Sequence, residues 1–222
     1  MNRVSQNLVL MLLGGAILRI SAFSTTYVNY VKPGFRPFLI AAGAALLLLG
    51  IVSWRRMPEH EHPGPRVAWL LCLPVLAIFL IAPPALGSFA ASRSDAAPPP
   101  PVQTGYQPLE GATAMPMGEF IGRAWGEGQT LKGHVITLTG FVTPSKKKDQ
   151  WYVTRMQLSC CAADAYALKV AVRGAAEPEE NTWVEVTGTW VPHVGKVPNG
   201  VVWAELEASS VEKVDEPAEP YE

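Results

Sequence analysis

The sequence is poor in the residues on which disulfide-stapled domains and catalytic centres depend. It contains three cysteines in 222 residues, too few for a framework of several disulfides. It has no Ser/His/Asp order, no phosphate-cradling glycine loop and no His-Glu-x-x-His motif. These absences exclude a disulfide-dense fold. They also leave no catalytic constellation, so we expect a protein that is not an enzyme.

Acidic residues are scarce in the first half of the chain, and they outnumber basic residues in the second. Residues 1–101 carry eight lysines and arginines against three acids, whereas residues 102–222 carry ten against sixteen. A basic, apolar half followed by an acidic, polar half indicates a membrane anchor joined to a domain outside the bilayer. Because nucleic acid binding requires a basic surface, the acidic half argues against a nucleic acid partner.

The first half contains three apolar runs that are long enough to cross a lipid bilayer. We predict a transmembrane region at residues 1–84, with helices at about 6–23, 38–54 and 67–84. The first run also resembles the apolar core of a signal peptide, but the further runs behind it favour an uncleaved helix. The chain would then be a multi-pass protein of the cell membrane.

Basic residues beside these runs give the expected orientation. Four lie on the side of the N-terminus and three on the other: Arg3, Arg55, Arg56 and Arg66 against Lys32, Arg36 and Arg93. The positive-inside rule therefore favours a cytoplasmic N-terminus and an extracytoplasmic C-terminal domain. The loop after the second run also contains His60 and His62, each next to a glutamate. Such a pair can hold a metal loosely, although a plain solvated loop is the simpler interpretation.

The second half is predicted to be a small all-β domain behind a linker. Residues 85–110 are rich in proline and small residues, which predicts an extended linker. Within residues 111–222 we predict one short helix at 117–125 and five strands, at 135–142, 151–159, 168–172, 183–191 and 201–208, the last continuing through 211–214. This pattern favours an OB-like barrel. Gly174–Asn181 is too short for the helix that an OB-fold commonly carries there, so the helix before the first strand is expected to cap the barrel.

Two adjacent cysteines, Cys160 and Cys161, directly follow the second predicted strand. Because side chains alternate along a strand, Cys160 is expected in the core and Cys161 outside, and both can then be chemically inert. A disulfide between them would be strained, since adjacent Cα atoms lie about 3.8 Å apart and disulfides usually need about 4.4–6.8 Å. A strained, easily reduced bond would suit a redox role.

A metal site is the third interpretation of the pair. It requires the strand to end or bulge at Cys160 and Cys161, so that both thiolates can reach one ion. Asp164 would then add an oxygen ligand or accept hydrogen bonds from backbone amides. Zinc or another soft metal such as Cu⁺ suits such a site, with His134 or His193 as sources of missing ligands. The run Lys146 to Lys148 is predicted to be a solvated hairpin tip, with contact to anionic lipid headgroups as the alternative.

Several strings of residues resemble a known family. They are Pro83 to Gly87, Phe141-Val142, Thr154-Arg155-Met156, Ser159 to Ala165 with its Cys-Cys-Ala-Ala-Asp motif, Trp183 to Trp190, and Pro220-Tyr221-Glu222. With the apolar helices, they make nearly the whole chain similar to the YcgQ-like family of bacterial membrane proteins, whose C-terminal domain has no assigned activity.

The resemblance implies an accessory subunit that pairs with a separate multi-spanning permease and has a link to metal homeostasis, zinc being the named candidate. A stand-alone metal-binding or metal-sensing membrane protein and a thiol-redox protein are the alternatives.

Overall fold

The computed structural model describes residues 3–55, 73, 84–93, 105–126, 128–192 and 203–222. Two compact units make up the chain, Met1–Ala85 and Leu86–Glu222, and each is described by itself. The loop with His60 and His62 lies outside the described residues, as does the predicted third span at 67–84 apart from Leu73 and Pro84.

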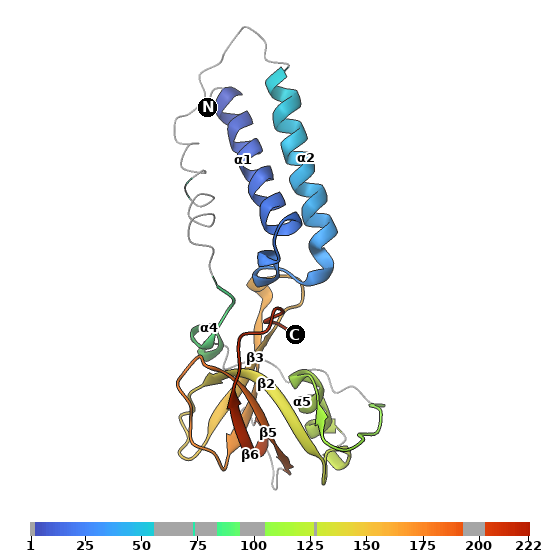
Figure 1. The fold of residues 1–222 in the computed structure, drawn as a ribbon, viewed down its shortest axis with the longest axis vertical. Coiled ribbons are helices and arrows are strands. Elements are labelled where there is room, and N and C mark those ends of the chain that lie inside the picture. The colour runs from blue at the N-terminus through green and yellow to red at the C-terminus, as the bar shows by residue number, and fades with distance from the viewer. Residues whose placement is uncertain (1–2, 56–72, 74–83, 94–104, 127, 193–202) are drawn as a thin grey trace. The chain divides into compact units, whose positions relative to one another are not determined.

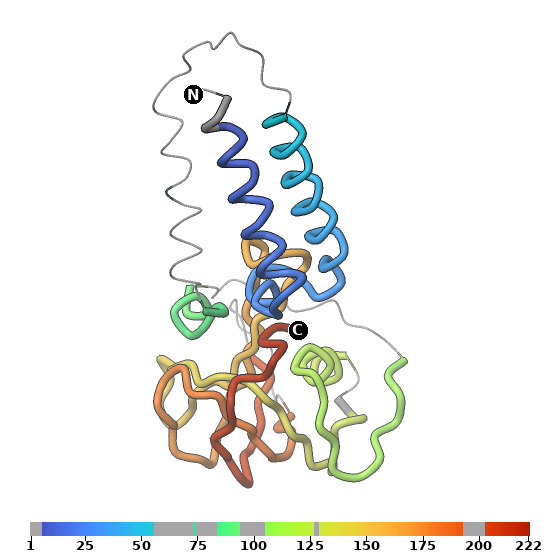
Figure 2. Tube along the Cα trace, turned by 45° about the horizontal axis from the view of Figure 1, so that its top comes forward, coloured from blue at the N-terminus to red at the C-terminus, as the bar shows by residue number. Residues whose placement is uncertain are grey.

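The first unit contains two helices of 20 residues each, α1 (Arg3–Ala22) and α2 (Arg36–Arg55). Two short 3₁₀ turns join them, η1 (Thr26–Asn29) and η2 (Pro33–Phe35). The helices lie side by side in both views (Figures 1 and 2). Their contact depends on glycine, because a Cβ added at Gly14 would lie 2.7 Å from the backbone oxygen of Gly43. Small residues thus permit the close approach of the two backbones.

One described segment, Pro33–Arg55, is long and apolar enough to cross a membrane by length and composition. Its outer side chains are apolar and exposed, Phe38 to 70% and Leu48 to 60%. The apolar part of the first helix, Gln6–Ala22, is shorter. Within the described residues, this gives one candidate span in place of three, so the three-helix anchor and its orientation stay predictions.

The second unit is built on a closed five-stranded β-barrel (Figure 1). Its strands are β2 (Val135–Thr143), β3 (Trp151–Gln157), β4 (Tyr166–Arg173), β5 (Trp183–Val191) and β6 (Ala204–Lys213). They pair in the order β2-β3-β4-β6-β5, and β5 closes the barrel by pairing with β2. Only the β4–β6 pairing among these five is parallel. A two-residue strand, β1 (Thr113–Ala114), runs parallel to β2.

The predicted β domain is thus confirmed as a barrel, with each expected strand in place. The strand predicted at 183–191 has those bounds in the structure. The predicted continuation of the fifth strand is also present, since β6 runs without a break through Val211 to Lys213. The second strand is shorter than predicted, because β3 ends at Gln157.

The barrel interior is filled by side chains that alternate along the strands and by one helix. Ile136 and Leu138 of β2 and Val153 of β3 are fully buried in it. The helix α5 (Met117–Gly126) adds Phe120, which has no exposed surface. Residues 174–181 contain no helix, as expected. The helix before the first barrel strand covers the core instead, since Phe120 and Ile121 of α5 belong to it.

A second, smaller core lies apart from the first. Met156 is buried there with Phe141 and Ala167, next to Trp183, and not in the main core. Ala91 completes it from α4 (Ser88–Ser92), a helix inside the predicted linker. The second unit therefore has more than the one short helix predicted, and Leu86 to Arg93 forms part of it.

Candidate functional site

The connection from β3 to β4 carries the adjacent cysteines. The strand ends at Gln157, and the chain then leaves the sheet until β4 begins at Tyr166. A single 3₁₀ turn, η5 (Ala162–Asp164), follows Cys161. Leu158, only 1% exposed, anchors the start of this connection in the protein. The break in the strand that a shared thiol site requires is therefore present.

The predicted orientation of the two cysteines is wrong. Cys160, expected in the core, is exposed, and Cys161, expected outside, is half-buried. Alternation of side chains holds only along an extended strand. Since β3 ends at Gln157, its alternation does not reach Cys160. Both thiols belong to a loop and not to a strand face.

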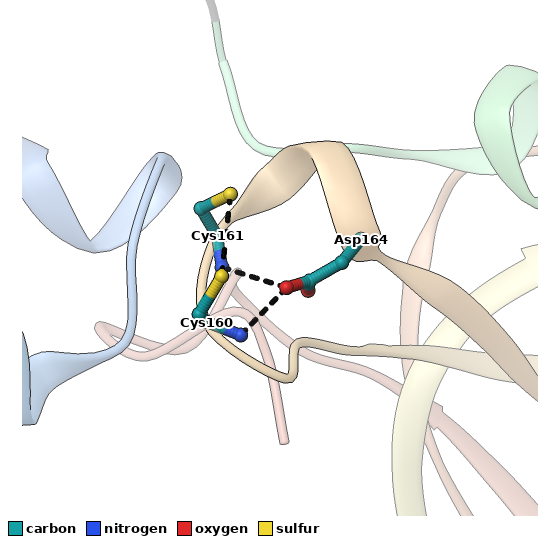
Figure 3. A group of neighbouring side chains, drawn as sticks. All are labelled: Cys160, Cys161 and Asp164. Atoms are coloured by element: carbon teal, nitrogen blue, oxygen red, sulfur yellow. Dashed lines mark hydrogen bonds between the residues drawn. The ribbon is translucent and has the colours of Figure 1, made fainter.

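The Asp164 carboxylate organises this loop (Figure 3). One oxygen, Oδ1, accepts the backbone N–H of Ser159 at 2.8 Å. The other, Oδ2, accepts the N–H groups of Cys160 at 2.8 Å and Cys161 at 3.3 Å. The Asp164 backbone N–H in turn donates to the carbonyl of Cys161 at 3.0 Å. The Cys161 side chain also accepts the Asp164 N–H, while the Asp164 carboxylate accepts the Cys161 N–H. This reciprocal pair is a capping box, and it fixes the backbone that carries both thiols.

The two sulfur atoms lie next to each other without a bond between them. Cys160 Sγ and Cys161 Sγ are 3.6 Å apart, and both cysteines are free. Together with a carboxylate oxygen of Asp164, these donor atoms all lie within 4.8 Å of one another. The group is therefore close enough to hold a metal ion, with soft sulfur as its main donor.

Hydrogen bonding sets the charge state of the group. The hydrogen bond from Cys160 and the three backbone N–H groups hold the pKa of Asp164 down to about 2. The hydrogen bond to Asp164, then that to Cys161, raises the pKa of Cys160 to about 11. At neutral pH the group therefore holds a carboxylate beside a neutral thiol. A metal ion binding there displaces the thiol proton.

The C-terminal residues brace the strand that leads into the site. Glu222 pairs with the end of β3, its N–H donating to Met156 O at 3.0 Å and its carbonyl accepting from Leu158 N at 3.1 Å. Its side-chain carboxylate accepts the N–H groups of Met117 at 2.8 Å and Gly118 at 2.9 Å, at the start of α5. Sequence reasoning missed this role. The only signal was the Pro220-Tyr221-Glu222 string, whose function the pattern does not show.

The other candidate ligands do not join the group. His134 is half-buried just before β2 and is not one of the clustered donors. His60, His62 and His193 lie outside the described residues.

Lys146 to Lys148 are exposed between β2 and β3, as predicted for a hairpin tip. They line a hollow of about 590 Å³ with Gly174 to Glu177, which contains neither cysteine of the pair.

Comparison with known protein families finds a match over the barrel. No curated protein matches the chain. A family match covers residues 127–222, which include all five barrel strands and the Cys160-Cys161 connection. The match does not include α1 or α2. It therefore does not test the resemblance to the YcgQ-like family or the pairing with a permease. The family that residues 127–222 match is the DUF1980 C-terminal domain.

Proposed function

We propose that this chain is a membrane-anchored, non-enzymatic accessory protein that binds a soft metal ion at Cys160 and Cys161. The observation that carries the proposal is the cluster of donor atoms from Cys160, Cys161 and Asp164 within 4.8 Å. Thiolates favour Zn²⁺ and Cu⁺ among the metals of the cell. The exposure of Cys160 gives an ion access from solvent.

The barrel supports this proposal as a rigid base for the site. Its strand order, with a parallel pairing of the third and fifth barrel strands (β4 and β6), agrees with an OB-like barrel. The cysteine connection joins the second and third of these strands, β3 and β4. A site held at both ends by a paired sheet keeps its geometry when empty, which favours binding.

The wider setting of the proposal is a bilayer and a multi-spanning permease as partner. The apolar segment Pro33–Arg55 supports attachment to a membrane. The family resemblance supports a bacterial cell, and the positive-inside rule supports an extracytoplasmic barrel. The resemblance to the YcgQ-like family supports the permease. Purification from native membranes in mild detergent should recover a multi-spanning protein with this chain. Recovery of the chain alone would remove the permease from the proposal and leave the metal site standing.

Metal analysis of the full-length chain tests the site. A Cys72→Ser background removes the third thiol, so that only the pair can contribute thiolate ligands. We expect this protein to retain about one equivalent of zinc or copper after desalting, as measured by elemental analysis. Cys160→Ser and Cys161→Ser should each lose most of it. Equal metal content in the parent and in the double variant would refute the proposed function.

A thiol-redox role is the second candidate, favoured by the 3.6 Å separation of the sulfur atoms. The raised pKa of Cys160, about 11, acts against it, because a thiol at neutral pH is a poor nucleophile. Mass spectrometry of protein purified without reductant decides between the two. A mass lower by two hydrogens, localised to Cys160 and Cys161, would establish the redox pair.

A further inference from the structure

The cysteine connection offers few donor groups for a metal ion. Two sulfur atoms and one carboxylate form the cluster, and no further histidine, cysteine or acid of the described residues joins it. The carboxylate is already engaged, since its two oxygens accept three backbone N–H groups from Ser159, Cys160 and Cys161. Turning Asp164 toward an ion would give up bonds that shape the loop. Two thiolates are therefore the donors that the loop can offer without refolding.

The spacing of these two sulfur atoms suits a tetrahedral ion. Zinc–thiolate bonds are about 2.3 Å long, so sulfur atoms 3.6 Å apart subtend roughly 100° at a shared ion. This angle is near the tetrahedral value. The pair can thus chelate one ion with little movement of either side chain.

A tetrahedral ion held by two sulfur atoms has two further positions to fill. Structural zinc sites are closed by four protein ligands, whereas sites that act on other molecules keep positions open. Here Cys160 is exposed. Among the described residues the one further donor in the cluster is Asp164, whose oxygens already accept three backbone N–H groups. The open side of the ion would face solvent.

We infer that Cys160 and Cys161 form an open, two-thiolate exchange site, at which a bound ion accepts an imidazole or thiolate donor from a second molecule. Asp164 acts as a positioning residue, because its carboxylate holds the backbone amides of the loop. The free positions of the ion are then left to the incoming donor. The inference rests on the proposed function, because it describes how the same site handles its metal.

Cobalt(II) provides the test, since it replaces zinc and reports thiolate ligation by its absorption. The full-length Cys72→Ser protein is loaded with Co²⁺ and titrated with imidazole, and in a separate arm with 2-mercaptoethanol. We expect a thiolate-to-cobalt band on loading, followed by a saturable spectral change with at least one donor. A band that neither donor changes would overturn the open site while keeping the metal site. Absence of any thiolate band would overturn the proposed function itself.

Variants of Asp164 separate positioning from ligation. Loss of an outer-shell partner costs about 10–100-fold in metal affinity. We expect Asp164→Ala to weaken Co²⁺ binding by about that factor, with Asp164→Asn recovering part of it, because its amide oxygen still accepts N–H groups. The spectrum of the bound ion should stay the same in both variants. A changed cobalt spectrum in Asp164→Ala at saturation would make Asp164 a ligand and overturn this part of the inference.

Discussion

The barrel carries two exposed connections, one on each side of β3, and they differ in how their backbones are held. The lysine connection between β2 and β3 has the Ser145 hydroxyl as its internal acceptor, bonded by the Lys147 N–H at 3.1 Å. The cysteine connection between β3 and β4 has one carboxylate bonded to three consecutive N–H groups. One loop presents charge to solvent. The other holds soft donors at a fixed spacing, as binding loops on rigid scaffolds do.

The largest effect is expected when both thiols of the cysteine connection are removed. The double variant Cys160→Ser/Cys161→Ser should lose zinc affinity by more than the roughly 100-fold that loss of an outer-shell partner costs, because both thiolate ligands are gone. Competition with a chromophoric chelator measures it, in the Cys72→Ser background. An affinity within threefold of the parent would show that the metal binds elsewhere.

The next effect tests the electrostatics of the same connection. The hydrogen bond to Asp164 is the largest of the causes, with that to Cys161 next, that raise the pKa of Cys160 to about 11. Asp164→Asn should therefore lower this pKa, increase the thiolate fraction and speed alkylation. We expect iodoacetamide to modify Cys160 about tenfold faster in the variant at pH 8.

The pH profile of alkylation provides the sign of the shift. In the parent the rate at Cys160 should keep rising with pH to about 11, whereas in Asp164→Asn it should level off at lower pH. Fragment-ion mass spectrometry assigns the label to Cys160 or Cys161. Identical profiles in the two proteins would contradict the role of the carboxylate.

A smaller effect is expected where the C-terminal residues brace the strand before the site. Glu222→Ala removes the acceptor for the Met117 and Gly118 N–H groups and should lower the free energy of unfolding by about 1 kcal/mol. Urea unfolding followed by tryptophan fluorescence measures this loss. Glu222→Gln keeps an acceptor oxygen and should lose less. Equal stability in all three proteins would mean that the cap contributes nothing.

The smallest effect belongs to the lysine connection and is the matched control. Replacing Lys146, Lys147 and Lys148 by alanine removes exposed side chains. We expect the free energy of unfolding to change by less than about 0.5 kcal/mol and zinc affinity to stay the same. A loss of metal binding in this variant would contradict the assignment of metal binding to the cysteine connection alone.

The sequence predicts the strands well because their signal is local. Alternating β-branched and apolar residues identify β2 and β5 without knowledge of their partners. The position of Met156 was not predictable in this way. Met156 lies on the face of β3 that points away from the main core. Ala91 of α4 and Trp183 bury this face, and the local sequence pattern does not reveal that burial.

The candidate site was predicted in its residues and not in its geometry. The Cys-Cys-Ala-Ala-Asp string identifies the donors, but strand alternation places Cys160 on the wrong side. Where β3 ends is decided by contacts that a periodic pattern cannot contain: the Asp164 bonds to the amides, and the pairing of Glu222 with Met156 and Leu158. A residue more than sixty positions away thus helps to fix the end of a strand.

The closure of the barrel has a consequence for the order of folding. β3 and β4 are joined by the short cysteine connection, and Gln157 pairs with Tyr166, close in the chain. Closure instead needs distant pairs, Leu138 with Val186 and Val170 with Ala204. Because loop-closure entropy delays distant pairing, we expect pulsed hydrogen exchange to protect the β3–β4 hairpin before the β2–β5 and β4–β6 pairings.

Protection of β2 and β5 before β3 and β4 would contradict this order. If the hairpin forms first, the thiol pair reaches its final spacing on a chain that is still open. The ion would then meet a nascent hairpin rather than a finished barrel, so metal supply could determine how much of this protein matures.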